Sequence, residues 1–444
     1  MAETDAKMTH RWTLGRVLPF LMLMIVVMDF ALRFVSLERL AFRPNEALRR
    51  LHVTPEGPFE PNREYHNDRT YGDLAALGNL PKRRVYRRVD FATDAFGFHN
   101  PVSRVESAPA GILLGDSFAI GAEVPEKKAL SAQLTELFSE RIYNAGGLLP
   151  LDLELVRRLA GQLRLQRGVL IYEFLEAHLQ ERPAIASAQP SWRARLAVRV
   201  LGSRGWYRLS GLISSLADSR LKLLAQRLEK EAENDRVLPN RFAGNVVQGR
   251  LRNGDWMLFS PSRIETADLA DAAVSRWAEF FRRASRELDR DGLGLVVIII
   301  PTKFTVYGPL LASPRVAPVG DIQLGQLERR LRKSEIPVVN VTPAFRAAAA
   351  ELAEHHEYIY WQDDTHWNEC GVSIAAAEFR EQIGLQPLPG FIGTESGPVS
   401  GSELKTALPS NCGSQQTPPE ISTVRSESSQ QETLSNNLER GILH

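Results

Sequence analysis

The chain has 444 residues, of which 43% are hydrophobic and 24% are charged, and these ordinary values exclude wholesale disorder, a collagen-like repeat and a polytopic membrane protein. The formal net charge is +1, so the chain lacks the basic excess of nucleic-acid-binding proteins, and we expect no nucleic-acid partner. Two cysteines are too few for a disulfide scaffold or a cysteine-rich metal site.

The first predicted element is an apolar helix near the N-terminus. Residues 17–28 are all apolar, and this character continues past Asp29 and Arg33 to Leu37. A segment of about 20 residues is long enough to cross a bilayer, and the two charges can pair because they are four positions apart on a helix. Residues 17–37 therefore predict an uncleaved signal anchor. A removable signal peptide and a buried helix of a soluble domain are the alternatives.

Basic residues flank this segment on both sides, so the positive-inside rule does not fix its orientation. A cytoplasmic segment over residues 1–16 is compatible with Lys7, Arg11 and Arg16. We expect residues 38–93 to be a linker or stalk. Residues 390–444 are rich in Ser, Thr, Gln, Asn, Gly and Pro, which predicts a disordered tail.

Between these ends, short apolar runs alternate with helical patterns. The predicted strands are 111–114, 141–143, 168–172, 293–300 and 337–341. The predicted helices are 128–140, 151–165, 267–288, 324–333 and 343–354. This alternation is typical of an α/β fold, and we expect a flavodoxin-like parallel sheet sandwiched by helices. Ligands of such sheets bind at the carboxyl ends of the strands.

One segment interrupts the alternation. Residues 181–256 have helical spacing, and residues 191–230 contain nine Arg or Lys against two acids. We predict a basic helical insertion. It is either solvated and packed on the main domain, or a lid that contacts anionic lipid or an acidic glycan.

The first chemical signal follows the strand over residues 111–114. Gly115-Asp116-Ser117 places a serine where a buried strand turns toward a helix, and the amides of such a turn can donate to an oxyanion. Ser117 is therefore the candidate nucleophile.

The second signal is a loop that contains Asp363, Asp364, Thr365 and His366. A serine nucleophile needs an imidazole to take its proton, and the imidazole needs a carboxylate to orient it. Asp363 and Asp364 can each reach back to His366. The same residues could bind a metal, but apart from His355 and His356 no second histidine lies nearby at ligand spacing, and we predict no metal site.

Two further strand ends carry polar or small residues. Asn144, Gly146 and Gly147 follow the strand over 141–143, and either glycine is a candidate second oxyanion donor. An ordinary turn is the alternative. Glu173 ends the next strand, where it either caps a neighbouring loop or acts directly in catalysis.

Together these segments resemble a known superfamily. Gly115-Asp116-Ser117, the loop from Asn144 to Gly146, and Asp363-x-x-His366 resemble the first, second and last sequence blocks of the SGNH (GDSL-type) hydrolases. Further segments resemble the alginate-type polysaccharide O-acetyltransferase branch: residues 94–100, 171–174 with Arg182, 301–307 and 364–368. The resemblance covers about residues 94–384, and we place an SGNH-like catalytic domain over residues 94–389.

The resemblance implies roles for these residues. Ser117 is the nucleophile and His366 the base, with Asp363 or Asp364 as the orienting acid. The Asp-x-x-His spacing of the superfamily favours Asp363 as the acid, whereas the Asp-x-His spacing of the alginate-type branch favours Asp364. We prefer Asp363. The Ser117 amide and Gly146 form the oxyanion hole. By the same resemblance, Lys303 and Tyr307 are glycan-facing or structural. The full set of candidate oxyanion or substrate-binding residues is Asn144, Gly146, Gly147, Glu173, Lys303, Tyr307 and Trp367.

The sequence departs from the family pattern in two places. The third superfamily block normally supplies an asparagine to the oxyanion hole, but here the strand ends in Tyr172-Glu173-Phe174. In the alginate enzymes the Asp-x-His pair precedes the serine, whereas here it follows.

The resulting hypothesis is a single-pass serine acyltransferase of a bacterial inner membrane, with a periplasmic catalytic domain. It adds O-acetyl groups to a cell-surface or exported polysaccharide and requires no cofactor. Its partners are the polysaccharide, the membrane and a membrane protein that donates acetyl groups. A carbohydrate esterase and a non-catalytic glycan-binding scaffold of an export complex are the alternatives.

Overall fold

The computed structural model describes residues 17, 19–35, 39–40, 43, 48–49, 57–101, 108–121, 123–148, 151–183, 220–234, 243–261, 271–313 and 320–383. The expected cytoplasmic segment over residues 1–16 and the expected tail over residues 390–444 lie outside these ranges.

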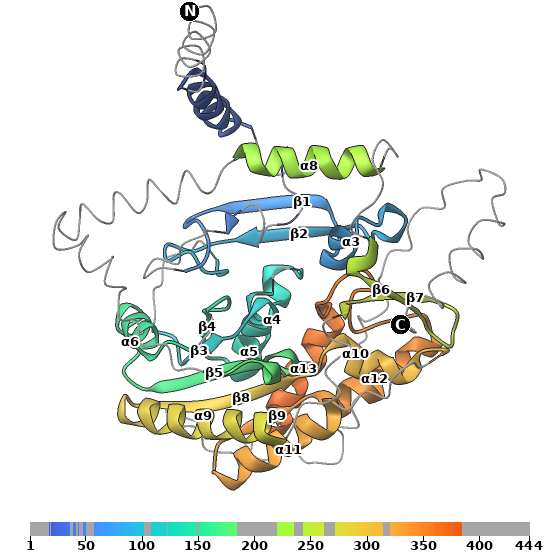
Figure 1. The fold of residues 1–444 in the computed structure, drawn as a ribbon. Coiled ribbons are helices and arrows are strands. Elements are labelled where there is room, and N and C mark those ends of the chain that lie inside the picture. Colours follow the sequence, from blue (N-terminus) through green and yellow to red (C-terminus); the bar gives the residue numbers. More distant parts are fainter. Residues whose placement is uncertain are drawn as a thin grey trace, which may run out of the picture. The chain divides into compact units, whose positions relative to one another are not determined.

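A five-stranded parallel sheet forms the centre of the fold, in the order β4-β3-β5-β8-β9 (Figure 1). Its strands are β3 (Gly111–Leu114), β4 (Ile142–Asn144), β5 (Gly168–Leu175), β8 (Leu293–Ile300) and β9 (Val338–Asn340). Numbered along the chain, the order is 2-1-3-4-5, which is the flavodoxin-like doubly wound arrangement. The expected α/β fold with a flavodoxin-like sheet is confirmed.

Helices cover both faces of this sheet. One face packs against α5 (Leu130–Phe138), α12 (Thr342–Glu354) and α13 (Glu369–Ile383). The other packs against α6 (Leu153–Gln162), α9 (Asp271–Arg290) and α11 (Gly320–Lys333). Every residue of β5 and β8 is buried, which explains why these strands read as continuous apolar runs.

Short helices connect the strand ends to these layers. They are α4 (Ser117–Ile120), α10 (Lys303–Tyr307), and the 3-10 turns η3 (Glu126–Lys128), η4 (Glu176–Gln180) and η8 (Gly308–Leu310). The helices α4 and α10 each begin three positions after the last residue of β3 and β8, so their N-terminal residues lie at the carboxyl edge of the sheet.

The segment that we expected to be a linker is folded over residues 57–93. It contains β1 (Glu64–Thr70), α3 (Asp73–Leu77), the 3-10 turn η2 (Pro81–Arg83) and β2 (Arg87–Ala92), and β1 pairs with β2 in antiparallel orientation. Every second residue of β2 is buried, beginning with Arg87. The prediction failed because these strands are mostly polar and contain no apolar run.

The insertion is only partly helical. Its described residues include the helix α8 (Arg220–Asn234), but the turn η5 (Ala243–Asn245) leads into β6 (Val247–Arg250), which pairs antiparallel with β7 (Trp256–Phe259). The prediction of a helical segment up to residue 256 is therefore wrong for β6. Residues 184–219 and 235–242 lie outside the described ranges.

The N-terminal apolar segment is helical over residues 19–32. Its side chains are exposed on all sides, with Phe20 at 61% and Phe30 at 62%. Asp29 forms the expected ion pair with Arg33 at 3.4 Å, and its Oδ1 accepts a hydrogen bond from the Leu221 amide of α8. Within the described ranges, no helix combines the length and the hydrophobicity that a bilayer crossing requires.

Candidate active site

The candidate nucleophile lies at the point of the sheet where the strand order reverses. β3 and β5 are neighbours here, and their connections leave toward opposite faces, which is where ligands of doubly wound sheets bind. Ser117 is the first residue of α4, and Asp116 precedes it as the N-cap, with Oδ1 accepting from the Phe118 amide at 2.8 Å. Ser117 is therefore held at the sheet edge by a tight strand-to-helix turn.

Ser117, His366 and Asp364 form a continuous hydrogen-bonded chain. His366 Nε2 lies 2.7 Å from Ser117 Oγ, and His366 Nδ1 lies 2.5 Å from Asp364 Oδ1. The same Asp364 oxygen also accepts from the His366 amide at 3.0 Å. Residues 249 positions apart in the sequence thus meet with the separation that proton transfer needs.

A short hairpin-like loop presents the histidine. Tyr360 and Trp367 form an isolated antiparallel bridge, and the Trp361 amide donates to the His366 carbonyl at 3.2 Å. Lys303 holds this loop in place. Its Nζ donates to the carbonyl oxygens of Trp361, Gln362 and Asp364 at 2.6 to 2.9 Å.

Asp363 points away from the imidazole. Its oxygens accept from the Gly72 amide at 2.7 Å, the Val85 amide at 2.8 Å and Arg87 Nη1 at 3.0 Å. Asp364, and not Asp363, contacts His366, so the geometry contradicts the preference for Asp363. Two consecutive residues of a loop direct their side chains differently, and sequence spacing could not distinguish them.

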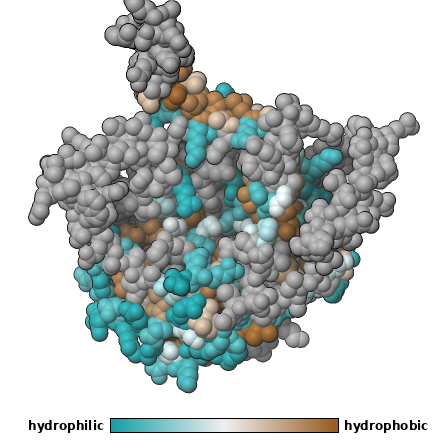
Figure 2. All heavy atoms as spheres, in the orientation of Figure 1, coloured by the Kyte–Doolittle hydropathy of each residue, from teal (hydrophilic) through white to brown (hydrophobic). Residues whose placement is uncertain are grey.

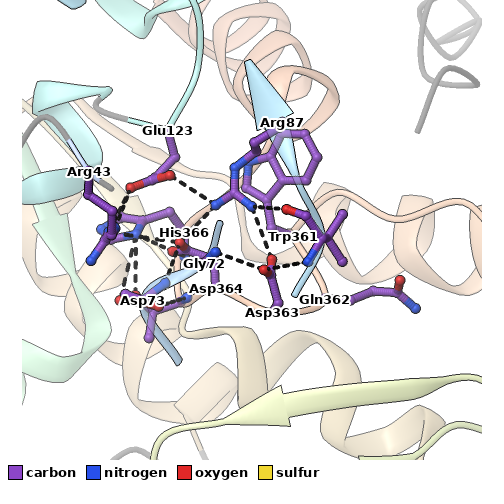
Figure 3. A network of polar contacts seen from close by, with 12 residues as sticks. Arg43, Gly72, Asp73, Arg87, Glu123, Trp361, Gln362, Asp363, Asp364 and His366 are labelled. Carbon is purple, nitrogen blue, oxygen red and sulfur yellow. Dashed lines mark hydrogen bonds and ion pairs between the residues drawn. The ribbon is translucent and has the colours of Figure 1, made fainter. Parts of the chain in front are cut away.

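Arg87 connects the two aspartates to a third carboxylate. Its Nη2 lies 2.9 Å from both Asp364 Oδ2 and Glu123 Oε2. Figure 3 shows Arg87 among the carboxylates that it joins. Arg43 adds a second guanidinium, with Nη2 at 2.6 Å from Glu123 Oε1 and 3.8 Å from Asp364 Oδ2. Arg87 and Arg43 therefore balance the negative charge of Asp364 at Oδ2, the oxygen that does not contact His366.

Asp73, at the start of α3, is a further acid beside the histidine. Its side chain accepts from the amide of Thr365 at 2.7 Å and from Thr365 Oγ1 at 2.5 Å, and its Oδ2 lies 3.9 Å from His366 Nδ1. The Asp73 amide in turn donates to Asp364 Oδ2 at 2.8 Å. The segment from β1 to β2, with α3 between the strands, is called the N-terminal hairpin below, and it supplies part of the surroundings of the triad.

These contacts shift the ionisation of the three groups. Burial alone opposes charge on Asp364, but the charge and hydrogen bond of His366, with Arg43 and Arg87, hold its pKa well below the usual range. Burial also lowers the pKa of His366, yet the negative charges of Asp364, Asp73 and Glu123 raise it overall to about 9. Burial and the neighbouring Asp364 raise the pKa of Asp73 to about 6.

The expected second oxyanion donor is engaged elsewhere. The Gly146 amide donates to Asn144 Oδ1 at 2.9 Å, and the Gly147 amide donates to the Gly115 carbonyl at 2.9 Å. The structure therefore contradicts both glycines as donors to substrate. The Ser117 amide, at the first position of α4, has no acceptor among the described residues and is the donor that the turn leaves open.

Asn144 and Gly146 instead support the nucleophile helix. Asn144 is buried, and its Nδ2 donates to the Ile120 carbonyl at the end of α4, at 3.2 Å. A Cβ at Gly146 would lie 2.4 Å from the Ile120 backbone nitrogen, so only glycine allows this close approach. His99, in the segment over residues 94–100, donates to the same Ile120 carbonyl, with Nδ1 at 2.7 Å.

Glu173 lies behind the nucleophile turn. It is fully buried, and its Oε2 accepts from the Asp116 amide at 2.9 Å. Gly115 fits directly over this carboxyl group, because a Cβ there would lie 2.4 Å from Oε2. Burial and the charge of Asp116 raise the pKa of Glu173 well above its usual value. Glu173 caps the turn and makes no contact with Ser117 Oγ or His366 among the described hydrogen bonds.

Three predicted substrate-facing residues are buried supports. Lys303 uses its ammonium group on the histidine loop, as described above. The Tyr307 hydroxyl accepts from the Ile359 amide at 2.9 Å, and the Trp367 ring packs edge-on against Phe118 with centroids 5.3 Å apart. Tyr307 and Trp367 are at most 1% exposed, so the structure contradicts them as glycan contacts.

One group of residues could hold a cation. Asp73, Asp364 and His366 offer ligand atoms within 4.8 Å of one another. However, His366 Nδ1 and Asp364 Oδ1 already share a hydrogen bond, and Arg87 and Arg43 place positive charge on the other side of Asp364. The residues present fit a hydrogen-bonded triad better than a metal site.

Sequence reasoning missed Asp73, Arg87, Arg43 and Glu123. One signal was available for Arg87. It alternates along β2 with Val89 and Phe91, so its side chain points to the same buried side as theirs. A charged side chain at a buried position requires a partner. The other three stand in polar segments without a pattern.

A pocket opens beside Ser117. Its empty volume is about 460 Å³, and its walls come from α3, β5, β7 and α10 as well as from α4 itself. The triad therefore borders a space in which a small reactant can bind.

The chain is similar to known proteins over part of its length. Residues 246–440, less than half of the chain, match a family described as "SGNH hydrolase-like domain, acetyltransferase AlgX". The matched part contains His366 and Asp364 but not Ser117.

Two curated relatives, both named "Probable alginate O-acetylase AlgJ", come from Pseudomonas putida and Pseudomonas aeruginosa. The first is 26% identical over 204 residues, which is 43% of this chain and 52% of the relative. The second is 26% identical over 201 residues, which is 41% and 50% respectively. The chain thus spans about half the length of the curated relatives it matches. The comparisons confirm the resemblance to SGNH-like, alginate-type O-acetyltransferases.

Proposed function

We propose that this chain is a membrane-anchored serine acyltransferase that adds O-acetyl groups to a cell-surface or exported polysaccharide. The observation that carries the proposal is the chain of contacts from Ser117 Oγ through His366 to Asp364, at 2.7 and 2.5 Å. It supplies a nucleophile, a base and an orienting acid in one line. The relatives named alginate O-acetylases support the polysaccharide as the acceptor.

The reaction proceeds in two halves. Neutral His366 takes the proton of Ser117 Oγ while that oxygen attacks the carbonyl carbon of an acetyl donor. The imidazolium then protonates the leaving group, and an acetyl-serine forms. In the second half, His366 takes the proton of a sugar hydroxyl, whose oxygen attacks the acetyl carbon, and the proton returns to Ser117. Asp364 stabilises the imidazolium in both halves, and the Ser117 amide donates to the oxyanion.

Among the residues that the structure describes, the Ser117 amide is the one backbone donor assigned to the oxyanion, and this observation supports the non-catalytic alternative. A scaffold that only holds glycan needs no reactive serine. The test is a fluorophosphonate probe applied to the full chain in detergent, together with release of acetate from an aryl acetate. We expect covalent labelling and turnover in the wild type and neither in Ser117→Ala. A wild-type protein that is folded but shows no labelling or turnover contradicts the enzymatic proposal.

Transfer and hydrolysis share the same acetyl-serine and differ in the group that resolves it. Adding alginate oligosaccharides to the aryl acetate reaction distinguishes them. A transferase yields acetylated oligosaccharide at the expense of free acetate. An esterase yields free acetate whether or not the oligosaccharide is present, and it also removes acetyl groups from acetylated oligosaccharides.

The anchor is the second part of the proposal. Apolar side chains exposed around a whole helix have no buried partner in water, and a bilayer would supply one. In Figure 2 the coloured part of this helix and α8 carry hydrophobic atoms on the face shown. We place the chain in a bacterial inner membrane, with the catalytic domain periplasmic and a membrane protein as the acetyl donor. Fractionation tests this: the full chain should require detergent for release, whereas high salt alone should suffice if the helix does not insert.

A further inference from the structure

The pocket beside Ser117 has walls that do not suit a sugar. Five apolar side chains line it, and each is at most 6% exposed: Leu74, Phe118, Leu175, Phe259 and Phe304. Phe259 and Phe304 pack edge to face with centroids 5.8 Å apart, which fixes the position of both rings. The lining is therefore rigid and mostly apolar.

Several polar groups of the lining already have partners. Lys303 Nζ has three carbonyl acceptors, and the Thr302 amide donates to Glu176 Oε2 at 2.7 Å. Asp116 accepts from the Phe118 amide. A sugar in this space would bury several hydroxyls without partners, which is costly, whereas an alkyl group loses nothing.

The size of the pocket points the same way. The empty volume of about 460 Å³ includes open solvent at the mouth, so the space enclosed by the walls is smaller than that. A short acyl chain fits such a space, and an oligosaccharide does not.

From this lining we infer that the pocket is the acyl-binding site of the enzyme and that Leu74 and Phe259 limit it to short acyl chains. The inference rests on the proposed function. It implies that the sugar acceptor approaches Ser117 from outside this pocket. Leu74 belongs to α3, whose first residues are hydrogen-bonded to Asp363 and Asp364, so the wall of the acyl site and the acid of the triad are positioned together.

The test is the acyl-chain preference of the full-length protein, measured as kcat/KM for p-nitrophenyl acetate, butyrate, hexanoate and octanoate. We expect the wild type to favour acetate or butyrate and to lose at least about tenfold at octanoate. Leu74→Ala should raise the hexanoate-to-acetate ratio by about fivefold, since one buried methylene is worth about fourfold in binding. Leu77→Ala is the matched control, because Leu77 lies on the same helix and is 48% exposed, so its ratio should not change.

A second variant acts in the opposite direction. Ser260 lines the pocket and is partly exposed, so Ser260→Val should narrow the pocket and lower the butyrate-to-acetate ratio without a large loss of stability. Labelling rates with ethyl and octyl fluorophosphonates provide a readout that does not depend on turnover. If labelling occurs but neither variant changes any ratio, the acyl-site inference is overturned and the proposed function stands. If the wild type reacts with no probe or ester, the proposed function itself fails.

Discussion

The guanidinium of Arg87 lies against the carboxylate of Asp363, with Nη1 3.0 Å from Oδ1, and both side chains are buried. Arg87 comes from the N-terminal hairpin and Asp363 from the histidine loop, so this ion pair joins the two parts of the site (Figure 3). The Nη2 atom of Arg87 lies 2.9 Å from Asp364 Oδ2. Asp363 therefore holds in place the arginine that in turn holds the triad acid.

The first prediction separates the roles of the two aspartates. Asp364→Asn should lower kcat for an aryl acetate by about 10³-fold or more, because the imidazole loses the carboxylate that sets its tautomer and stabilises its charge. Asp363→Asn should lower kcat less than tenfold but reduce the free energy of unfolding by about 3 kcal/mol, because it removes the charge opposite a buried arginine. Steady-state kinetics and denaturant unfolding of both variants measure this. The assignment is wrong if Asp363→Asn is as inactive as Asp364→Asn while still folded.

The second prediction concerns pH. A base accepts a proton only when it is neutral, and the carboxylates around His366 raise its pKa to about 9. The kcat/KM of an aryl acetate should therefore increase with pH and level off near that value, once the reaction of Ser117→Ala is subtracted as the blank. Because the folded pKa exceeds the unfolded value of about 6.5, protonated His366 stabilises the fold below pH 6.5, and this contribution is lost as pH rises through 9. A profile that levels off below pH 7 would show that the surrounding carboxylates do not act on the imidazole.

The sequence predicted the sheet well for a physical reason. Strands such as β8 are buried on both faces, and a short uninterrupted apolar run rich in Val and Ile is typical of such a strand. The position of Ser117 at a strand end followed from the same pattern, because a doubly wound sheet brings its carboxyl ends to one edge.

The surroundings of the triad could not be predicted in this way. Arg87 and Asp73 reach the site through the hairpin, whose strands are mostly polar, and only folding reveals which polar residues become buried. Gly146 was misassigned for a related reason: small residues permit either a free amide or a close packing contact, and here the contact with α4 is the one that forms.

The third prediction tests the hydrogen bonds by which Lys303 holds the loop that carries His366. Lys303 donates to three carbonyl oxygens, which requires the three N–H groups of an ammonium ion, although burial lowers its pKa to about 7. Lys303→Met keeps the length of the side chain but leaves those carbonyls without a donor. We expect it to reduce the free energy of unfolding by about 3 kcal/mol or more and to lower kcat, since His366 is no longer held against Ser117.

Lys333→Met is the control for this variant, because Lys333 is exposed at the end of α11. Its free energy of unfolding should stay within about 0.5 kcal/mol of the wild type. Equal stability of Lys303→Met and Lys333→Met in urea unfolding would show that the three contacts contribute nothing.

The last prediction assigns a positioning role to Asp73. Its Oδ2 lies 3.9 Å from His366 Nδ1, and its pKa of about 6 means that it is charged above that pH. Asp73→Asn keeps an oxygen acceptor for Thr365 but removes the charge, so the pKa of His366 should decrease by about one unit. The pH profile of kcat/KM should shift to lower pH by the same amount, while Asp73→Glu should restore most of the original profile. NMR titration of the His366 ring follows the same pKa without relying on turnover. An unchanged titration in Asp73→Asn would mean that Asp73 only holds Thr365 and that Asp364 alone sets the basicity of the imidazole.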